Sequence, residues 1–168
     1  VYDRENIHRN LGYEKYYGGS TLNMDEHELD RQLINGFDAM TEKSPFFSFV
    51  ITYSAHGPYG EDNVIYQENK DAAQAAAQRT DGNYVYAVAG AMETDRFIGE
   101  LMDKLRESGH DKDTVLVFYA DHYNYYMMDD ALNMELKGVD NMNMLQHTDF
   151  FIWADGIEPT QIDKVTAT

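Results

Sequence analysis

The sequence contains no cysteine. Disulfide bonds, thiolate catalysis and cysteine-ligated zinc are therefore excluded for these 168 residues. The absence leaves the cellular compartment open, because many secreted bacterial proteins also lack cysteine.

Basic residues are scarce. Thirteen Lys and Arg stand against thirty Asp and Glu, which gives a formal net charge of −17. This balance argues against a nucleic-acid partner, because phosphate backbones require a basic face. It also argues against broad electrostatic attraction to an anionic membrane. A small anionic substrate stays open, since a bound metal ion can reverse the local field.

Long apolar runs are missing as well. None approaches the roughly 18 residues that a membrane-spanning helix needs, and no signal peptide opens the chain. The chain starts abruptly at Val1 and ends at Thr168 without a closing element. We therefore expect a fragment of a longer protein, with any membrane anchor or export signal in the missing part.

The residues that are present predict a globular fold. Apolar residues make up 43% and aromatic residues 13%, enough for a hydrophobic core. Apolar positions at helical spacing predict helices over 25–41, with Asp25 as the N-cap, and over 83–108, with Gly109 as the stop. Residues 61–82 are compatible with a further helix, whereas 123–146 show no clear period. Short apolar runs predict three strands: 46–53, 114–120 and 150–154.

The order of these elements indicates an α/β layer architecture. In such sheets, ligands bind beyond the C-terminal ends of the strands. Two predicted strands end next to residues that can do chemistry. The run 46–53 leads into His56, and the run 114–120 leads into Asp121 and His122. This coincidence is the main indication of a site from the residues alone.

Three groups are candidates for the chemistry, two near these strand ends and one in the polar N-terminal segment. The carboxylate of Asp121 and the imidazole of His122 suit a divalent metal such as Mn²⁺ or Zn²⁺, and the alternative is a solvated turn. His56, in a Ser-Ala-His-Gly-Pro loop, can bond a phosphate or sulfate oxygen or protonate a leaving alkoxide. Arg4 can clamp an oxyanion through its planar fork. The alternative for both is an ordinary surface position.

Other polar residues have two interpretations. Asp95 shares the stripe of apolar positions on the predicted helix 83–108, so we expect a buried side chain with a partner, beside the site or in a structural pair. His147 is either a further ligand or a strand-entry residue. Tyr and Met residues at 123–128 either line a lipid or glycerol pocket or pack the core and loops. The remaining histidines are expected at the surface: His8, His27 and His110.

Several segments together resemble one family. Residues 114–122, TVLVFYADH, are similar to the strand and Gly-Asp-His signature of the sulfatase-like branch of the alkaline phosphatase superfamily. Residues 45–59, PFFSFVITYSAHGPY, resemble the segment of lipoteichoic acid synthases that carries a substrate-contacting histidine. Further segments similar to these enzymes are 1–17, 84–113 and 147–157. The loops 61–80 and 123–146 are unmatched.

The resemblance implies a fold and a metal site. Residues 1–168 would form a partial catalytic domain of a three-layer, sulfatase-like α/β fold with a mostly parallel central sheet. Asp121 and His122 would be metal ligands, for Mn²⁺ in the first place and for Mg²⁺ or Zn²⁺ as alternatives. A glutamate ligand and a nucleophilic threonine are expected upstream of this chain. Ala120 replaces the glycine that the family usually has before Asp-His.

The resemblance also implies a substrate and a reaction. His56 would contact a phosphoglycerol head group and Arg4 its phosphate, with Tyr2 where the family usually has a tryptophan. The implied enzyme is a phosphoglycerol transferase that uses phosphatidylglycerol to extend a glycerol-phosphate polymer of the lipoteichoic acid type. It would act on the extracellular face of the cytoplasmic membrane of a Gram-positive bacterium, held there by missing segments, and 1–168 alone would be inactive.

Two kinds of alternative remain. One is another enzyme of the superfamily, namely a sulfatase, a phosphodiesterase or a phosphoethanolamine transferase. The other is a non-catalytic relative that binds wall polymer or lipid head groups.

Overall fold

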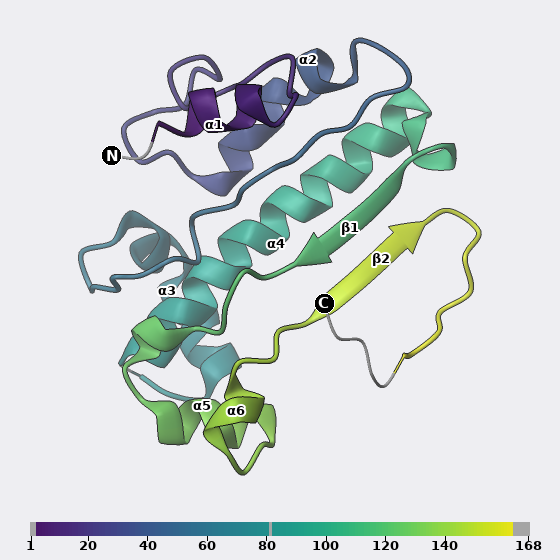
Figure 1. Ribbon diagram of the computed structural model, residues 1–168. Coiled ribbons are helices and arrows are strands. Elements are labelled where there is room, and N and C mark those ends of the chain that lie inside the picture. The colour runs from purple at the N-terminus through teal and green to yellow at the C-terminus, as the bar shows by residue number, and fades with distance from the viewer. Residues whose placement is uncertain (1–2, 81, 163–168) are drawn as a thin grey trace. The chain divides into compact units, whose positions relative to one another are not determined.

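The computed structural model describes residues 3–80 and 82–162. They divide into two compact units, 3–80 and 82–101 with 124–130, and 102–123 with 131–162. The helices and strands are, in chain order, α1 (Arg4–Asn10), η1 (Asp30–Gly36), α2 (Phe37–Thr41), α3 (Val64–Ala77), α4 (Asn83–Ser108), η2 (His110–Lys112), β1 (Val115–Tyr119), η3 (Tyr125–Met127), α5 (Asp130–Lys137), α6 (Met142–Leu145) and β2 (Phe150–Ala154) (Figure 1).

Helix α4 confirms the strongest helical prediction, with the same first and last residues. Gly109 follows it with φ of +77°, a left-handed conformation that glycine adopts without steric cost, and its amide bonds the carbonyl of Arg106. The predicted apolar stripe holds in part, since Leu105 is buried and Val88 and Met92 pack against the core, but the most buried stripe is a neighbouring one. The buried positions Val85, Ala89, Glu93 and Phe97 recur every four residues.

The core of the first unit joins α3 to the N-terminal part of α4, which lie next to each other in Figure 1. Ala73 of α3 and Ala89 of α4 are both fully buried in this core. The helix that the sequence allowed within 61–82 is therefore present as α3. It begins at Asn63, whose side chain accepts a hydrogen bond from the Ile65 amide at 2.9 Å.

The helix predicted over 25–41 is shorter than expected. Asp25 caps a local turn instead, since its carboxylate accepts from the His27 amide at 2.9 Å. Glu28 has φ of +48°, which no right-handed helix accommodates. A 3₁₀ turn therefore begins only at Asp30, and the α-helical part is limited to α2.

The prediction of a strand at 46–53 is wrong for the described structure. The segment is extended chain outside any strand, and Phe47, Phe49, Ile51 and Tyr53 are all exposed. A strand requires a neighbour, and at its end the amide of Tyr53 donates to the carboxylate of Asp30 instead of to another strand. The run was apolar enough for a strand, but no described strand pairs with it.

The second unit contains the sheet. Strands β1 and β2 confirm the predictions at 114–120 and 150–154. They pair antiparallel, with Val117 opposite Ile152, and Phe118 stacks on Phe151 at 4.6 Å between ring centroids (Figure 1). The predicted mostly parallel sheet is therefore not seen among the described residues, whose only ladder is this antiparallel pair. The predicted fold class is confirmed only in that the described residues form both helices and a small sheet.

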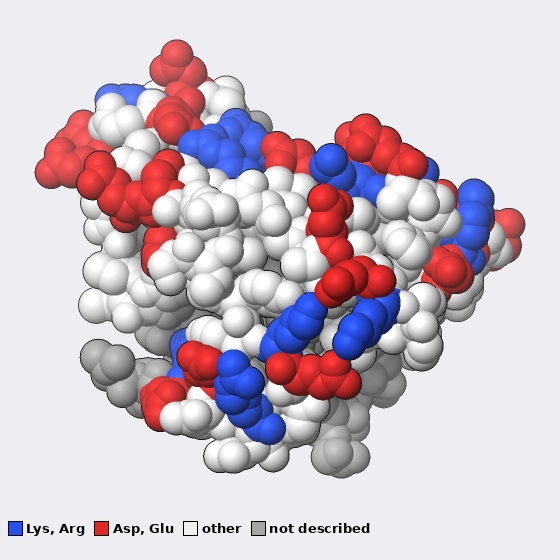
Figure 2. Space-filling model, turned by 90° about the horizontal axis from the view of Figure 1, so that it is seen from above, with Lys and Arg blue, Asp and Glu red and all other residues white. Residues whose placement is uncertain are grey.

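Acidic and basic side chains are interspersed at the surface. On the face in Figure 2, Lys and Arg groups lie next to Asp and Glu groups. One exposed pair joins Arg106 to Asp103 at 2.9 Å. Such exposed pairs contribute little to stability. Among the described helices, none is both long and apolar enough to cross a membrane.

Candidate functional site

His56 lies on a tight turn in the first unit. The turn is closed by the His56 amide, which donates to the carbonyl of Tyr53 at 2.9 Å. The residue is exposed, although the neighbouring Gly57 is buried. The ring Nδ1 contacts the carbonyl oxygen of Gly57. A carbonyl can only accept, so Nδ1 carries the proton, and in the neutral ring Nε2 carries the lone pair.

Two tyrosines hold the imidazole ring of His56. The ring stacks on Tyr53 with 4.9 Å between centroids and an interplanar angle of 12°, and Tyr126 lies 5.0 Å away at 58°. Tyr126 also packs on Gly57, where a Cβ would lie 2.2 Å from its Cγ. Gly57 is therefore required for this packing. Within the Tyr-rich segment 123–128, Tyr126 thus packs on the turn, and a lipid or glycerol pocket lined by this segment stays a prediction.

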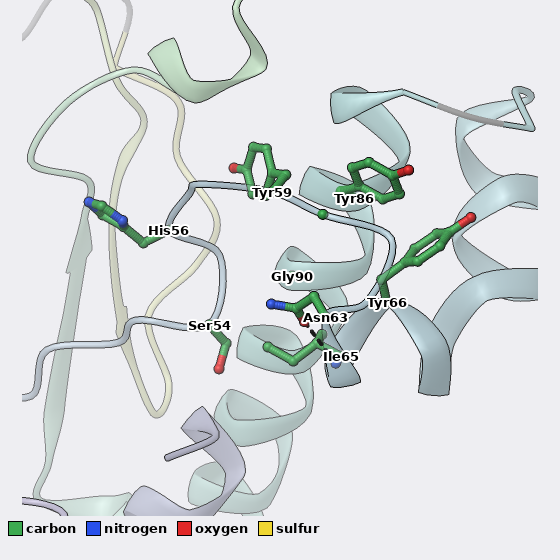
Figure 3. Close-up of a pocket in the computed structure, with 9 residues that line it drawn as sticks. Ser54, His56, Tyr59, Asn63, Ile65, Tyr66, Tyr86 and Gly90 are labelled. Carbon is green, nitrogen blue, oxygen red and sulfur yellow. Dashed lines mark hydrogen bonds between the residues drawn. The ribbon is translucent and has the colours of Figure 1, made fainter. Parts of the chain in front are cut away.

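Tyr59 stabilises the same turn through its hydroxyl group. Its hydroxyl donates to the Ala55 carbonyl at 2.8 Å and accepts from Nδ2 of Asn124 at 2.7 Å. Burial raises the pKa of the Tyr59 hydroxyl above its ordinary value of 10.0, which keeps the proton that the first bond needs. The hollow beneath the turn has a volume of about 10 Å³, room for about one water molecule. In Figure 3, His56 points away from Tyr66 and Tyr86, which line this hollow. A substrate would therefore meet His56 at the surface.

Asp121 and His122 form a pair in the second unit, directly after β1, as the sequence predicted. Nε2 of His122 lies 3.5 Å from Oδ1 of Asp121, and the Asp121 side chain is 85% exposed. Nδ1 of His122 lies 2.8 Å from the Tyr123 carbonyl, so this nitrogen donates its proton. In a neutral ring the lone pair is then on Nε2, the nitrogen that faces the carboxylate. A backbone carbonyl on the far nitrogen is the usual support of a metal-binding histidine.

This donor set fits a divalent metal in part. A carboxylate oxygen and an imidazole nitrogen at one strand end suit Mn²⁺, Mg²⁺ or Zn²⁺. Two ligands are too few for any of these ions, and the described residues contain no cluster of three or more such side chains. The pair therefore provides part of a coordination shell.

The other predicted substrate contacts are less well placed. Arg4 is the first residue of α1; it is exposed and makes no ion pair within the described part of the chain. Tyr2 lies outside the described residues. His56 and Arg4 belong to the first unit, and Asp121 and His122 to the second. That these four side chains share one pocket stays a prediction.

Two predictions about burial are wrong. Asp95 is exposed, because the buried stripe of α4 passes through Glu93 and Phe97 instead, which removes the reason for giving Asp95 a partner beside the site. Of the histidines expected at the surface, His27 is exposed, but His8 and His110 are half-buried; the His8 ring lies 5.9 Å from both Tyr16 and Phe49. His147 is exposed before β2.

Sequence reasoning missed two buried carboxylates. Asp30 is 1% exposed and Glu93 is 0% exposed. Glu93 is paired with Arg31 and Arg96 at 3.4 and 3.5 Å. Asp30 binds the chain just before His56. Apart from Arg96, which is three positions after Glu93, their partners are far away in the sequence, so no local pattern marks the two carboxylates as buried.

The chain belongs to the sulfatase family, whose family model matches residues 1–168. It is similar to lipoteichoic acid synthase of Staphylococcus saprophyticus, at 24% identity over 99% of this chain and 26% of the relative. It is also similar to lipoteichoic acid synthase 1 of Bacillus subtilis, at 25% identity over 72% of this chain and 19% of the relative. A third relative is a putative cyclic β-1,2-glucan modification protein of Rhizobium meliloti, at 26% identity over 80% and 21%.

The chain thus spans about a fifth to a quarter of the length of these curated relatives. No solved structure matches it.

Proposed function

We propose that this chain is a catalytic part of a metal-dependent phosphoglycerol transferase. Its donor would be phosphatidylglycerol, and its acceptor a growing glycerol-phosphate polymer. The family match over the whole chain and the relatives named lipoteichoic acid synthases support this class of enzyme. The single observation that carries the proposal is the Asp121–His122 pair after β1, with the lone-pair nitrogen of the neutral His122 ring turned toward the carboxylate.

The metal site would be completed by residues of the full-length protein. Asp121 and His122 would hold one side of a divalent cation, Mn²⁺ in the first place. The bound cation would supply Lewis acidity at the phosphoryl oxygens of the substrate. The covalent nucleophile, a threonine in the family pattern, is not assigned to any residue of this chain.

The remaining groups would bind and orient the substrate. Nε2 of His56, held outward by Tyr53 and Tyr126, is placed to accept a hydrogen bond from a head-group hydroxyl or, once protonated, to donate to a phosphate oxygen. Arg4 has no carboxylate partner among the described residues, so its guanidinium is available to a phosphate through two parallel hydrogen bonds. Such preorganised donors stabilise the charge that develops on the transferred group.

One relative points to a second acceptor. The Rhizobium meliloti protein is named for modification of cyclic β-1,2-glucan. A soluble glucan could therefore replace the polymer as the acceptor, with the same donor and the same metal site. The extracellular face of the cytoplasmic membrane is proposed as the location only for the enzyme that extends the glycerol-phosphate polymer.

The test is an assay of the full-length protein with Mn²⁺ on a fluorescent phosphatidylglycerol and, in parallel, on an aryl sulfate. Release of diacylglycerol from the lipid, with the aryl sulfate intact, is the expected result. Transfer of label to added cyclic glucan would identify the second acceptor. Hydrolysis of the aryl sulfate with an intact lipid would refute the transferase in favour of a sulfatase. Tight Mn²⁺ binding without turnover of either compound would indicate a non-catalytic binding protein.

A further inference from the structure

Asp30 is a buried carboxylate whose contacts all serve the chain around it. Only 1% of its surface is exposed. Oδ1 accepts from the amides of Tyr53 at 2.7 Å and Ser54 at 3.1 Å. Oδ2 accepts from the Thr94 hydroxyl at 2.6 Å. Both oxygens are thus satisfied by uncharged donors.

The contact with Ser54 is reciprocal. The Asp30 amide donates to Oγ of Ser54 at 2.9 Å, while the Ser54 amide donates back to the Asp30 carboxylate. The two residues therefore form a closed ring of hydrogen bonds between the start of η1 and the chain that leads into His56. A ring of this kind fixes the backbone at Ser54 more firmly than a single bond does.

Helix α4 supports the same turn from beneath. Thr94, which binds Asp30, is one helical turn after Gly90 and lies on the same face. A Cβ at Gly90 would lie 2.7 Å from the Ser54 carbonyl oxygen and 2.9 Å from Cα of Ala55. The backbone of the turn thus rests directly on α4, and Figure 3 shows Ser54 beside Gly90 there. Asp30 ties the turn to this surface through Thr94.

The residues that Asp30 fixes are the ones that place the imidazole. Tyr53 supplies both the carbonyl that closes the turn and the ring on which His56 stacks. The Tyr53 amide is the closer of the two amides to the Asp30 carboxylate. A shift of the backbone at Tyr53 and Ser54 would therefore move the ring and the turn together.

We infer that Asp30 is a positioning residue for His56, which acts by holding the backbone of Tyr53 and Ser54 against helix α4. The inference rests on the proposed function for the role of His56 toward substrate. The alternative is a purely structural carboxylate. Burying a carboxylate without a cation is costly, and Asp30 takes part in no ion pair among residues 3–80 and 82–162. A role in holding the amides of Tyr53 and Ser54 explains why a carboxylate is found at this position.

Glu93 provides the matched control. It is also fully buried, and it precedes Thr94 on α4. Its Oε1 accepts from the Arg31 amide at 3.1 Å, and its charge is balanced by Arg31 and Arg96. None of these bonds reaches residues 53–56. Glu93→Gln therefore perturbs a buried carboxylate of the same unit without touching the His56 turn.

The first measurement is amide hydrogen exchange of the full-length protein, read in peptides that cover residues 53–58. For Asp30→Ala we expect exchange at Tyr53 and Ser54 to become about tenfold faster or more, because both amides lose a charged acceptor. Asp30→Asn should give a smaller change, since one amide oxygen can still accept both bonds. Glu93→Gln should leave these peptides as they are in the wild type. Unchanged exchange in Asp30→Ala, or equal changes in Glu93→Gln, would overturn the inference.

The second measurement is a double-mutant cycle of turnover with His56→Ala. If Asp30 acts through His56, the double variant turns over no more slowly than His56→Ala alone, whereas Glu93→Gln combines additively with it. Additive losses for Asp30→Ala would overturn the inference. If His56→Ala has no measurable turnover, the cycle cannot be read, and the conservative variant is used instead. Asp30→Asn must then retain most of the activity that Asp30→Ala loses, and a loss as large as in Asp30→Ala would overturn the inference.

The two measurements separate the inference from the proposed function. If His56→Ala leaves turnover at the wild-type level, the proposed role of His56 is refuted. The exchange result then still decides whether Asp30 holds the turn.

Discussion

Replacing Gly90 with alanine should push the His56 turn away from helix α4. The added Cβ would lie 2.7 Å from the carbonyl oxygen of Ser54 and 2.9 Å from Cα of Ala55. Both are backbone atoms, so neither can move aside by a change of rotamer. The turn must shift, or the helix must bend.

The expected cost follows from two opposing effects. Overpacking of a tight contact costs about 1–3 kcal/mol. Alanine in place of glycine within a helix contributes about 1 kcal/mol in the other direction. Gly99→Ala on the same helix isolates this second effect, because a Cβ at Gly99 meets no atom within 4 Å. We therefore expect Gly99→Ala to be stabilised by about 1 kcal/mol and Gly90→Ala to lie about 1–3 kcal/mol below it.

The assay is urea unfolding of the full-length protein and the two variants, with the free energy of unfolding extrapolated to water. The difference between the variants is the informative quantity, since the helix-propensity contribution cancels in it. Amide exchange at residues 53–58 shows in the same samples whether the turn has moved. Equal stabilisation of Gly90→Ala and Gly99→Ala would refute the close contact between α4 and the turn.

Three further changes test other parts of the structure. Asp121→Ala should weaken Mn²⁺ binding to the full-length protein by at least about tenfold in calorimetry, whereas the exposed Asp95→Ala should not, and equal affinities would contradict the proposed ligand. Tyr59→Phe should cost about 1 kcal/mol of stability at neutral pH. The pKa of Tyr59 is raised in the folded protein, so the hydroxyl loses its proton first in the unfolded chain. The wild type should therefore lose stability as the pH rises above about 10. Melting temperatures measured across this pH range should fall less in Tyr59→Phe. Glu93→Ala should destabilise the protein by about 1–3 kcal/mol in chemical unfolding, because the Arg31 amide loses its acceptor, and a cost well under about 1 kcal/mol would show that this contact is unimportant.

Local patterns predicted the elements whose formation depends mainly on their own residues. Helix α4 and strands β1 and β2 lie where periodicity and apolar runs placed them. Asp121 and His122 follow β1 as expected. The segment 46–53 has the composition of a strand, but strand formation depends on a neighbour that the run itself cannot specify.

Long-range contacts account for what the sequence did not reveal. The stripe through Asp95 was a reasonable apolar face, but packing against α3 selects the stripe through Val85 and Ala89 instead. The bonds of Asp30 join residues that are 23, 24 and 64 positions apart. A single sequence offers no signal for such a contact, since an isolated aspartate at the start of a 3₁₀ turn has the pattern of a solvated residue.

The β1–β2 ribbon has a practical consequence for anyone who handles this chain in isolation. Each strand has one hydrogen-bonded neighbour among the described residues, so the outer edge of each presents backbone amides and carbonyls with no strand opposite them. Val117, Phe151 and Ile152 are each about half exposed on the same ribbon. Two-stranded ribbons are marginal in water, and such edges recruit further strands. Samples of residues 1–168 alone should therefore associate as their concentration rises, and light scattering belongs among the first measurements on them.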